Sequence, residues 1–256
     1  MKHLKSEKGF TLVELAIVMT IIGLLIGGIL KGQELMENAR VTSTIAQVRS
    51  YEAAVTTFRD TYSAMPGDMA NANARLPNCG GSCNAGGGLT GDSLIGTVGD
   101  VTSNQATVAS ETVLFWSHLL LTNLISGVTS DPALNPGTAQ IAWGESHPAA
   151  RIGGGFHVKT GDGATALAFA ASGIQPPGIN LVLQNAVAAD INGTAGVQVL
   201  SPLRAAQIDR KMDDGKSQTG YLQSYGAATC ANGGTNADSY DESTASDDCG
   251  LFFRLQ

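Results

Sequence analysis

Residues Gly9–Leu30 read GFTLVELAIVMTIIGLLIGGIL, and this stretch decides how the N-terminal part of the chain folds. Glu14 is the single charged residue in it, and nearly all the others are apolar. A helix needs about 20 apolar residues to cross the hydrocarbon core of a membrane, and residues 10–30 meet that length. A carboxylate at membrane depth is costly and is functional by default, so a partner for Glu14 has to be found.

Two ordinary explanations, a secretory signal peptide and a simple membrane anchor, do not account for all features of this segment. The leader MKHLKSEKG places Lys2, Lys5 and Lys8 before the apolar run, which favours a cytoplasmic N-terminus. A secretory signal peptide has an apolar region of about 7–15 residues that ends in small residues at its cleavage site. The apolar run of this chain is longer than that and is not followed by an Ala-x-Ala cleavage site. A simple membrane anchor explains the length and the orientation, but it gives no reason for Glu14.

The stretch KGFTLVELAIVMTIIGLLIGGI closely resembles the class III signal of type IV pilins and type II secretion pseudopilins. The resemblance implies that a membrane peptidase cuts between Gly9 and Phe10 on the cytoplasmic side, and that Phe10 is then methylated. It also implies an assembly role for Glu14, the fifth residue of the mature chain, which would pair with the α-amino group of Phe10 in a neighbouring subunit. A buried charge paired with its opposite resolves the cost of Glu14.

The helical pattern continues beyond the membrane-length run. Apolar residues recur at helical spacing at Val41, Ile45, Val48, Val55, Phe58 and Tyr62. Pro66-Gly67 then ends the pattern, so we expect one helix from residue 10 to about 63. The expected organisation is a leader (1–9), a transmembrane or filament-core helix (10–30), an amphipathic continuation (31–64) and a globular head (65–256).

Four glycines lie within the expected helix, at Gly23, Gly27, Gly28 and Gly32. They are compatible with close contact between membrane helices. They are also compatible with a stretch that unwinds locally during assembly, because each Gly costs about 1 kcal/mol relative to Ala in a helix.

The head is expected to be an α+β domain. SAMPGDM (63–69) and IDRKMDDGKSQTG (208–220) resemble segments of one large group of prepilins. A second amphipathic helix is expected over about 110–126, capped by Gly127, with His118 on its surface or at its end. A short helix is expected from Ser201 to Gly215. Short antiparallel strands are expected at Gln140–Trp143, Gly155–Lys159, Ala166–Phe169 and Asn180–Leu183, with the tail LFFRLQ packed on the sheet.

The four cysteines form two local pairs, Cys79/Cys83 and Cys230/Cys249. An even count in an exported chain favours disulfides. Closing a loop of about 20 residues between Cys230 and Cys249 is worth about 3 kcal/mol in the loop-entropy model. For Cys79 and Cys83, in CGGSC, free thiols or a metal remain open alternatives.

Composition and motifs argue against an enzyme. The chain has 256 residues, is 14% charged with a net charge of −7, and shows no basic footprint for nucleic acid. Gly215-Lys216-Ser217 lacks the glycine that a phosphate-binding loop needs at position 210, which is Arg210. There is no Gly-x-Ser-x-Gly or His-Glu-x-x-His pattern.

Two acidic groups are candidates for cation sites. Asp209, Asp213 and Asp214 are expected to form a solvated helix end. The C-terminal cysteine loop carries five acids, and Ca²⁺ takes 6–8 oxygen ligands. A solvated acidic loop is the preferred interpretation, with no resident cofactor and calcium as the alternative. The five acids are Asp238, Asp241, Glu242, Asp247 and Asp248.

The resemblance implies a non-enzymatic filament subunit. The expected location is the bacterial inner membrane, in a single pass with the N-terminus cytoplasmic and the head periplasmic, and then an extracellular or periplasmic filament. Its expected partners are membrane lipid, copies of itself, other pilins, a prepilin peptidase and the inner-membrane assembly machinery. A pseudopilin of a type II secretion system is the nearest alternative, and a membrane-anchored binding module is a more remote one.

Overall fold

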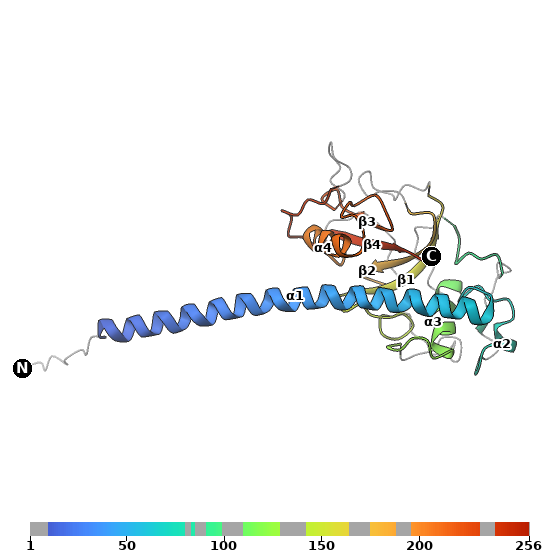
Figure 1. Ribbon diagram of the computed structural model, residues 1–256, viewed down its shortest axis with the longest axis horizontal. Coiled ribbons are helices and arrows are strands. Elements are labelled where there is room, and N and C mark those ends of the chain that lie inside the picture. Colours follow the sequence, from blue (N-terminus) through green and yellow to red (C-terminus); the bar gives the residue numbers. More distant parts are fainter. Residues whose placement is uncertain are drawn as a thin grey trace, which may run out of the picture. The chain divides into compact units, whose positions relative to one another are not determined.

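The computed structural model describes residues 10–79, 83–84, 91–98, 110–128, 142–163, 175–187, 196–230 and 239–255. The chain forms two compact units, residues 1–40 and 41–256, and helix α1 (Leu12–Tyr62) runs from the first into the second (Figure 1). The other elements belong to the second unit. They are α2 (Ala72–Arg75), α3 (Glu111–Leu121), β1 (Gly155–Gly161), β2 (Gly178–Gln184), α4 (Pro202–Met212), β3 (Leu222–Gly226) and β4 (Cys249–Arg254). The expected α+β class is confirmed.

In the first unit, the described chain is the start of α1, and up to Leu30 its side chains are apolar on nearly all sides. Every residue from Phe10 to Met36 is exposed in the single chain. By length and composition α1 is able to cross a membrane, with a mean hydropathy of 2.5 in its most apolar window. The helix is continuous through Gly23, Gly27, Gly28 and Gly32, and added Cβ atoms there would meet nothing within 4 Å. A surface of this kind is stable only where lipid or other helices cover it.

In the second unit, α1 buries one stripe in the core of the head. The buried residues are Val41, Thr44, Val48, Tyr51, Ala54, Val55 and Phe58. Tyr51 is central to this packing, since its ring makes edge contacts with Trp116 of α3 at 5.2 Å and with Phe156 of β1 at 5.6 Å between centroids. The expected apolar stripe did not include Tyr51, whose hydroxyl accepts a hydrogen bond from Gln47 at 2.8 Å.

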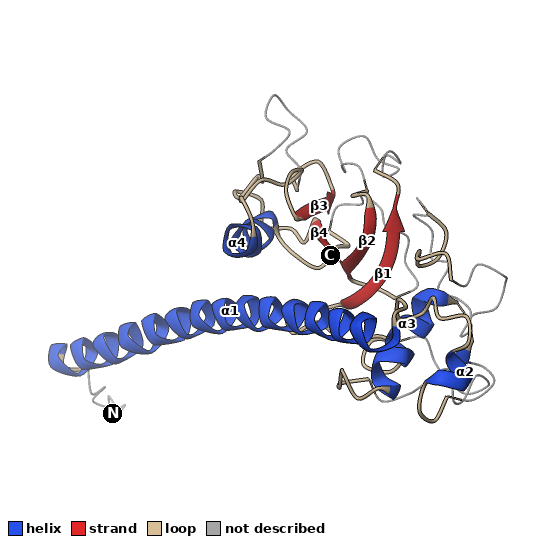
Figure 2. Ribbon diagram, turned by 45° about the vertical axis from the view of Figure 1, so that its right-hand side comes forward, coloured by secondary structure: helices blue, strands red, loops and turns tan. Residues whose placement is uncertain are grey.

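The sheet is four-stranded and antiparallel, in the order β1-β2-β4-β3 (Figure 2). Its register pairs Phe156 with Leu183 and Leu181 with Phe253. These side chains belong to the main core, together with residues of α1 and α3. The alternate positions Val182, Tyr225 and Phe252 form a second small cluster, as the period of two in a strand requires. Both sets are buried, and the second face also carries the buried polar side chains of His157, Lys159, Asn180 and Gln184.

The structure confirms two of the expected strands and corrects the expectations for the others that it describes. Gly155–Lys159 and Asn180–Leu183 lie within β1 and β2. The described end of Gln140–Trp143 forms no strand, because Trp143 makes only an isolated bridge to His147. Ala166–Phe169 lies outside the described residues. The tail expected to pack on the sheet is instead strand β4, hydrogen-bonded between β2 and β3.

The expectation for the second helix is corrected at its end and on its surface. Helix α3 ends at Leu121, because Asn123 takes the left-handed conformation at φ 57° before the chain reaches Gly127. The helix is buried on nearly all sides rather than amphipathic. His118 is completely buried and lies on neither the surface nor the cap.

Helix α4 begins as expected and ends earlier than expected. Pro202 occupies the first turn after Ser201, although Ser201 makes no capping hydrogen bond through its side chain. The C-cap is Asp213 instead of Gly215. Gly215 still takes a positive φ of 77° in the turn that follows, and its N–H donates to Asp209 Oδ1 at 3.1 Å.

Candidate processing and assembly site

The candidate site lies at the N-terminal end of α1, around Phe10, Thr11 and Glu14. Phe10 is 87% exposed and precedes the first helical residue, Leu12. Gly9, the residue expected on the other side of the cleavage point, lies outside the described residues. Phe10 is therefore exposed immediately before the helix begins, as a protease substrate requires.

Thr11 and Glu14 form a reciprocal capping pair. The Thr11 N–H donates to Glu14 Oε2 at 2.9 Å, and the Thr11 hydroxyl donates to the same oxygen at 2.8 Å. In return, the Glu14 N–H donates to Thr11 Oγ1 at 3.3 Å. This is the capping box, in which Ser or Thr at the N-cap and Glu or Gln three residues later satisfy free donors at a helix start.

The capping pair gives Glu14 a partner within its own chain. Both side-chain hydrogen bonds use Oε2, and no hydrogen bond from the described residues reaches Oε1. The carboxylate also lies at the positive end of the helix dipole, which favours an anion. The second oxygen is thus open to a further donor from outside the chain.

Thr11 was not among the expected site residues, although its sequence signal was present. Thr11-x-x-Glu14 followed by an apolar run is the sequence pattern of a helix N-terminus. The expected role of Glu14 in assembly involves a neighbouring subunit, whereas its local partner is Thr11. The two roles are compatible, because they use different oxygens.

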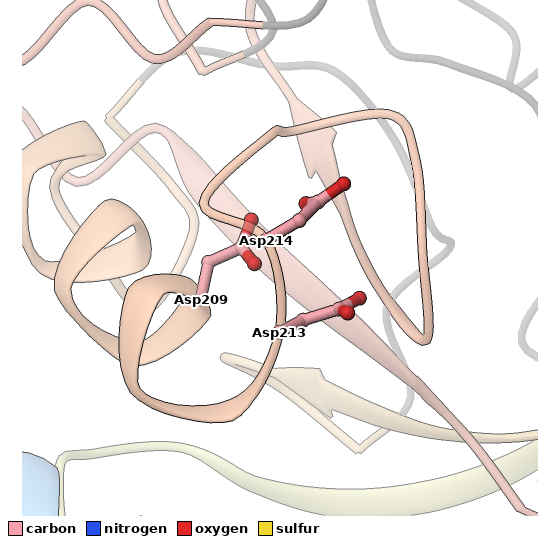
Figure 3. Close-up of side chains that lie close together, drawn as sticks. All are labelled: Asp209, Asp213 and Asp214. Carbon is pink, nitrogen blue, oxygen red and sulfur yellow. The ribbon is translucent and has the colours of Figure 1, made fainter.

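The acids at the end of α4 lie close together (Figure 3), but the expected solvated helix end is wrong for Asp209, which is buried, while Asp214 is exposed. Asp209, Asp213 and Asp214 place one carboxylate oxygen each within 4.8 Å of one another. Asp209 is completely buried and accepts hydrogen bonds from Tyr240 Oη at 2.8 Å and from Gly215. Burial raises the pKa of Asp209 to about 6, against the lowering effect of these two hydrogen bonds.

Each neighbouring acid also has its own donors. Asp213 accepts from the Leu222 N–H at 2.9 Å, and Asp214 accepts from the Thr219 hydroxyl at 2.7 Å. The three carboxylates therefore organise the turn between α4 and β3 through the protein's own donors.

The acids of the C-terminal cysteine loop are dispersed. Asp248 is buried and accepts from the Gly196 N–H at 2.8 Å, from Ser246 and from Thr229. Glu242 forms an ion pair with Arg210. Asp241 accepts from Ser243 and Thr244, and Asp247 is exposed. Asp238 lies outside the described residues. The described acids of this loop form no common group of metal ligands, and calcium binding there stays an untested alternative.

The cysteines lie at distances suited to disulfides. The Cα atoms of Cys230 and Cys249 are 5.3 Å apart, and those of Cys79 and Cys83 are 5.8 Å apart. Both separations are in the usual range for a disulfide. A disulfide between Cys230 and Cys249 would connect the segment after β3 to the first residue of β4.

Comparison with known proteins identifies the N-terminal segment. Residues 4–30 match the family described as the prokaryotic N-terminal methylation motif. No curated protein and no solved structure matches the chain. The match covers Gly9, Phe10, Thr11 and Glu14, and it includes the whole apolar run. The chain therefore carries the class III signal that marks the precursors of type IV pilins and pseudopilins.

Proposed function

We propose that this protein is a structural, non-enzymatic subunit of a type IV pilus-like filament. A prepilin peptidase cuts it between Gly9 and Phe10 and methylates Phe10. The subunit waits in the inner membrane with its head in the periplasm, and copies then polymerise through their N-terminal helices. The observation that carries the proposal is an apolar helix, exposed on all sides in the single chain, that begins with the processing motif.

The geometry at Glu14 supports the addition of a second partner during assembly. In the single chain, Thr11 supplies two donors to Oε2. In the filament, the Phe10 ammonium of a neighbouring copy binds Oε1 of Glu14. This contact lies among the packed N-terminal helices, where there is little water. Leaving either charge without its partner in such a surrounding costs several kcal/mol, so the pair favours the assembled arrangement.

The first test concerns processing. Mass spectrometry of the mature protein should find a chain that begins at Phe10 and carries one added methyl group. Cleavage within the apolar run, beyond residue 25, would indicate an ordinary signal peptidase and would contradict the proposal.

The second test separates the two roles of Glu14. Glu14→Leu should insert into the membrane and still be cut after Gly9, yet yield few filaments, because it loses both the cap and the charge. Glu14→Gln keeps a residue suited to the capping box but removes the charge. Both variants should therefore assemble poorly if the ion pair drives assembly.

The readout of this test is the amount of filament sheared from cells, divided by the total membrane-bound subunit, in cells that make no other pilin. Normal yield from Glu14→Gln alone would assign Glu14 to helix capping. Normal yield from both variants would remove Glu14 from assembly altogether.

A pseudopilin of a type II secretion system shares the same N-terminal motif and the same predicted helix packing. The genes beside this one discriminate the two functions: a retraction ATPase favours a pilus, whereas a secretion operon favours a pseudopilin. Partners common to both are other pilins and an inner-membrane assembly machine.

A further inference from the structure

The segment 91–98 lies between α2 and α3 in the chain and contains neither a helix nor a strand. Its first half is held by one buried carboxylate. Asp68 is 3% exposed, and its two oxygens accept from the N–H groups of Gly91 and Ser93, the latter at 2.7 Å. A side chain from another part of the head thus supplies the hydrogen bonds that regular secondary structure would otherwise make.

The second half of the segment is attached to β1 and α3. The Ile95 N–H donates to Thr160 Oγ1 at 2.8 Å, and the same hydroxyl donates to the Ile95 carbonyl at 3.1 Å. The Gly96 N–H donates to Glu111 Oε2 at 2.7 Å. Ile95 is completely buried in the main core of the head, so these attachments keep an apolar side chain of the segment away from water.

Acids surround the attachment point on α3. Glu111 lies in the first turn of α3, and its Oε1 is buried without a hydrogen-bond partner. Within the described residues, the charges that act on it are those of Asp68 and of Asp92, which belongs to the segment itself. Arg75 of α2 lines a hollow together with Asp68, but its guanidinium donates to the Tyr62 carbonyl. Ionised Glu111 would therefore be a third negative charge beside the segment, with one oxygen lacking a donor.

The closed arrangement favours a proton on this carboxyl. Burial raises the pKa of Glu111 to about 7, and the charges of Asp68 and Asp92 add to this effect, whereas the hydrogen bond from Gly96 opposes it. The positive end of the α3 dipole also favours the anion, but the net shift is upward. Burial lowers the pKa of His118 further along α3, which favours its neutral form. Water that reaches Glu111 would restore its ordinary pKa, so the closed form loses stability as the pH rises from 4.5 to about 7.

We propose that the segment 91–98 is a pH-dependent latch on the head. When Glu111 carries a proton, the segment is closed on α3 and β1. When Glu111 ionises, repulsion from Asp68 and Asp92 and the missing donor at Oε1 favour an open form, in which water solvates the carboxylate. The hydrogen bonds to Asp68 do not involve this proton, so the segment opens from its Gly96 end.

The test is hydrogen–deuterium exchange of the full chain in lipid nanodiscs, measured by mass spectrometry at pH 5 and pH 8 and corrected for the intrinsic exchange rate. Protection of a peptide that covers residues 91–98 should fall at least about tenfold as the pH rises. At pH 8, about 1 M urea should hardly change this exchange, because a local opening exposes little surface, whereas exchange in β2 by global unfolding should accelerate several-fold. Equal protection at the two pH values, or acceleration by urea equal to that in β2, would overturn the proposal.

Variants connect the opening to the named acids. Glu111→Gln keeps an acceptor for the Gly96 N–H but cannot ionise, so protection of the segment should differ by less than about twofold between the two pH values. Asp92→Asn keeps an acceptor for the Leu94 N–H and removes one of the two charges, so the fall in protection should be smaller than in wild type. Glu145→Gln, at an acid before β1 that lies outside the segment, should keep the wild-type response.

A wild-type response in folded Glu111→Gln would overturn the latch. It would leave the filament proposal standing, because the processing motif and the N-terminal assembly contact involve no residue of this segment.

Discussion

At the residue scale, the head depends on buried polar side chains that each hold two or more segments together. His118 is the clearest case. Its Nδ1 accepts from the Gly67 N–H at 2.9 Å, so the ring proton lies on Nε2 and donates to the Cys83 carbonyl at 2.9 Å. Burial lowers the pKa of His118, which keeps the ring in this neutral form.

Glu111, at the start of α3, is also favoured in its neutral form, but for an acid this means that burial shifts the pKa upward. Its Oε2 accepts from the Gly96 N–H at 2.7 Å, while Oε1 is buried without a partner. Burial raises the pKa of Glu111 from 4.5 to about 7; the Gly96 hydrogen bond lowers it, and the charges of Asp68 and Asp92 raise it further. The folded head therefore favours the protonated carboxyl.

We predict a pH-dependent effect of Glu111→Gln. Below pH 4.5, Glu111 is protonated in both states; between 4.5 and 7, the unfolded chain releases the proton while the folded chain keeps it. Wild-type stability contributed by this group is thus complete at low pH and is lost as pH rises to about 7. Gln cannot ionise, so the stability of the variant relative to wild type should rise by about 1–2 kcal/mol across this window, with solvent screening allowed for.

The measurement is urea unfolding of the full chain in nanodiscs at pH 4.5, 6 and 8, with Glu145→Gln as the control for loss of one charge. The buried histidines His118, His147 and His157 also affect stability in this range, but they are common to both proteins and cancel in the difference. The prediction would be contradicted if the stability of Glu111→Gln relative to wild type stays constant or falls as the pH rises.

At the element scale, the turn that follows α1 fixes how the helix meets α3. Gly67 has a φ of 86°, and a Cβ atom there would lie 2.4 Å from the Glu111 carbonyl oxygen. The backbone of this turn thus lies directly against the first turn of α3. Only glycine combines that conformation with that proximity.

Gly67→Ala should therefore destabilise the head by about 3 kcal/mol or more, because strain in φ adds to an overlap with backbone that has no room to move. Gly127→Ala is the matched control, since Gly127 has a similar φ of 91° but a Cβ added there would meet no atom within 4 Å. The control should cost about 1 kcal/mol. Thermal or urea unfolding of both variants gives the comparison, and equal losses would show that contact with α3 is unimportant.

At the scale of the whole molecule, the two units differ in how they reach stability. The second unit has its own core, built from the stripe of α1, from α3 and from one face of the sheet. The start of α1 has no core and exposes apolar side chains on every side. A cysteine pair between Cys230 and Cys249 then closes the C-terminal end of the head.

We predict that non-reducing peptide mapping of the exported protein links Cys230 to Cys249. Replacing both with Ser should destabilise the head by about 3 kcal/mol or less, because the cross-link acts mainly on the unfolded chain. Membrane insertion should be unchanged, since it depends on residues 10–30. Free thiols at both positions in exported protein would refute the link.

The N-terminal helix, its processing motif and the α+β class were predictable from the sequence. The apolar run, the basic leader and the acid at Glu14 are local features, and so is the start of α4 at Pro202. Strands β1 and β2 were found because β-rich runs are bounded by turn residues. In each case, neighbouring residues carry the information that sets the conformation.

The remaining features depended on contacts between distant residues. Leu251-Phe252-Phe253 shows no alternation, since both sides of β4 are buried, and its place between β2 and β3 follows from pairing with them. Asp209 is buried because Tyr240 covers it from a segment 31 residues away. Local sequence specifies which side chains are polar, but only tertiary packing decides which of them leave water, since that depends on what the fold places over them.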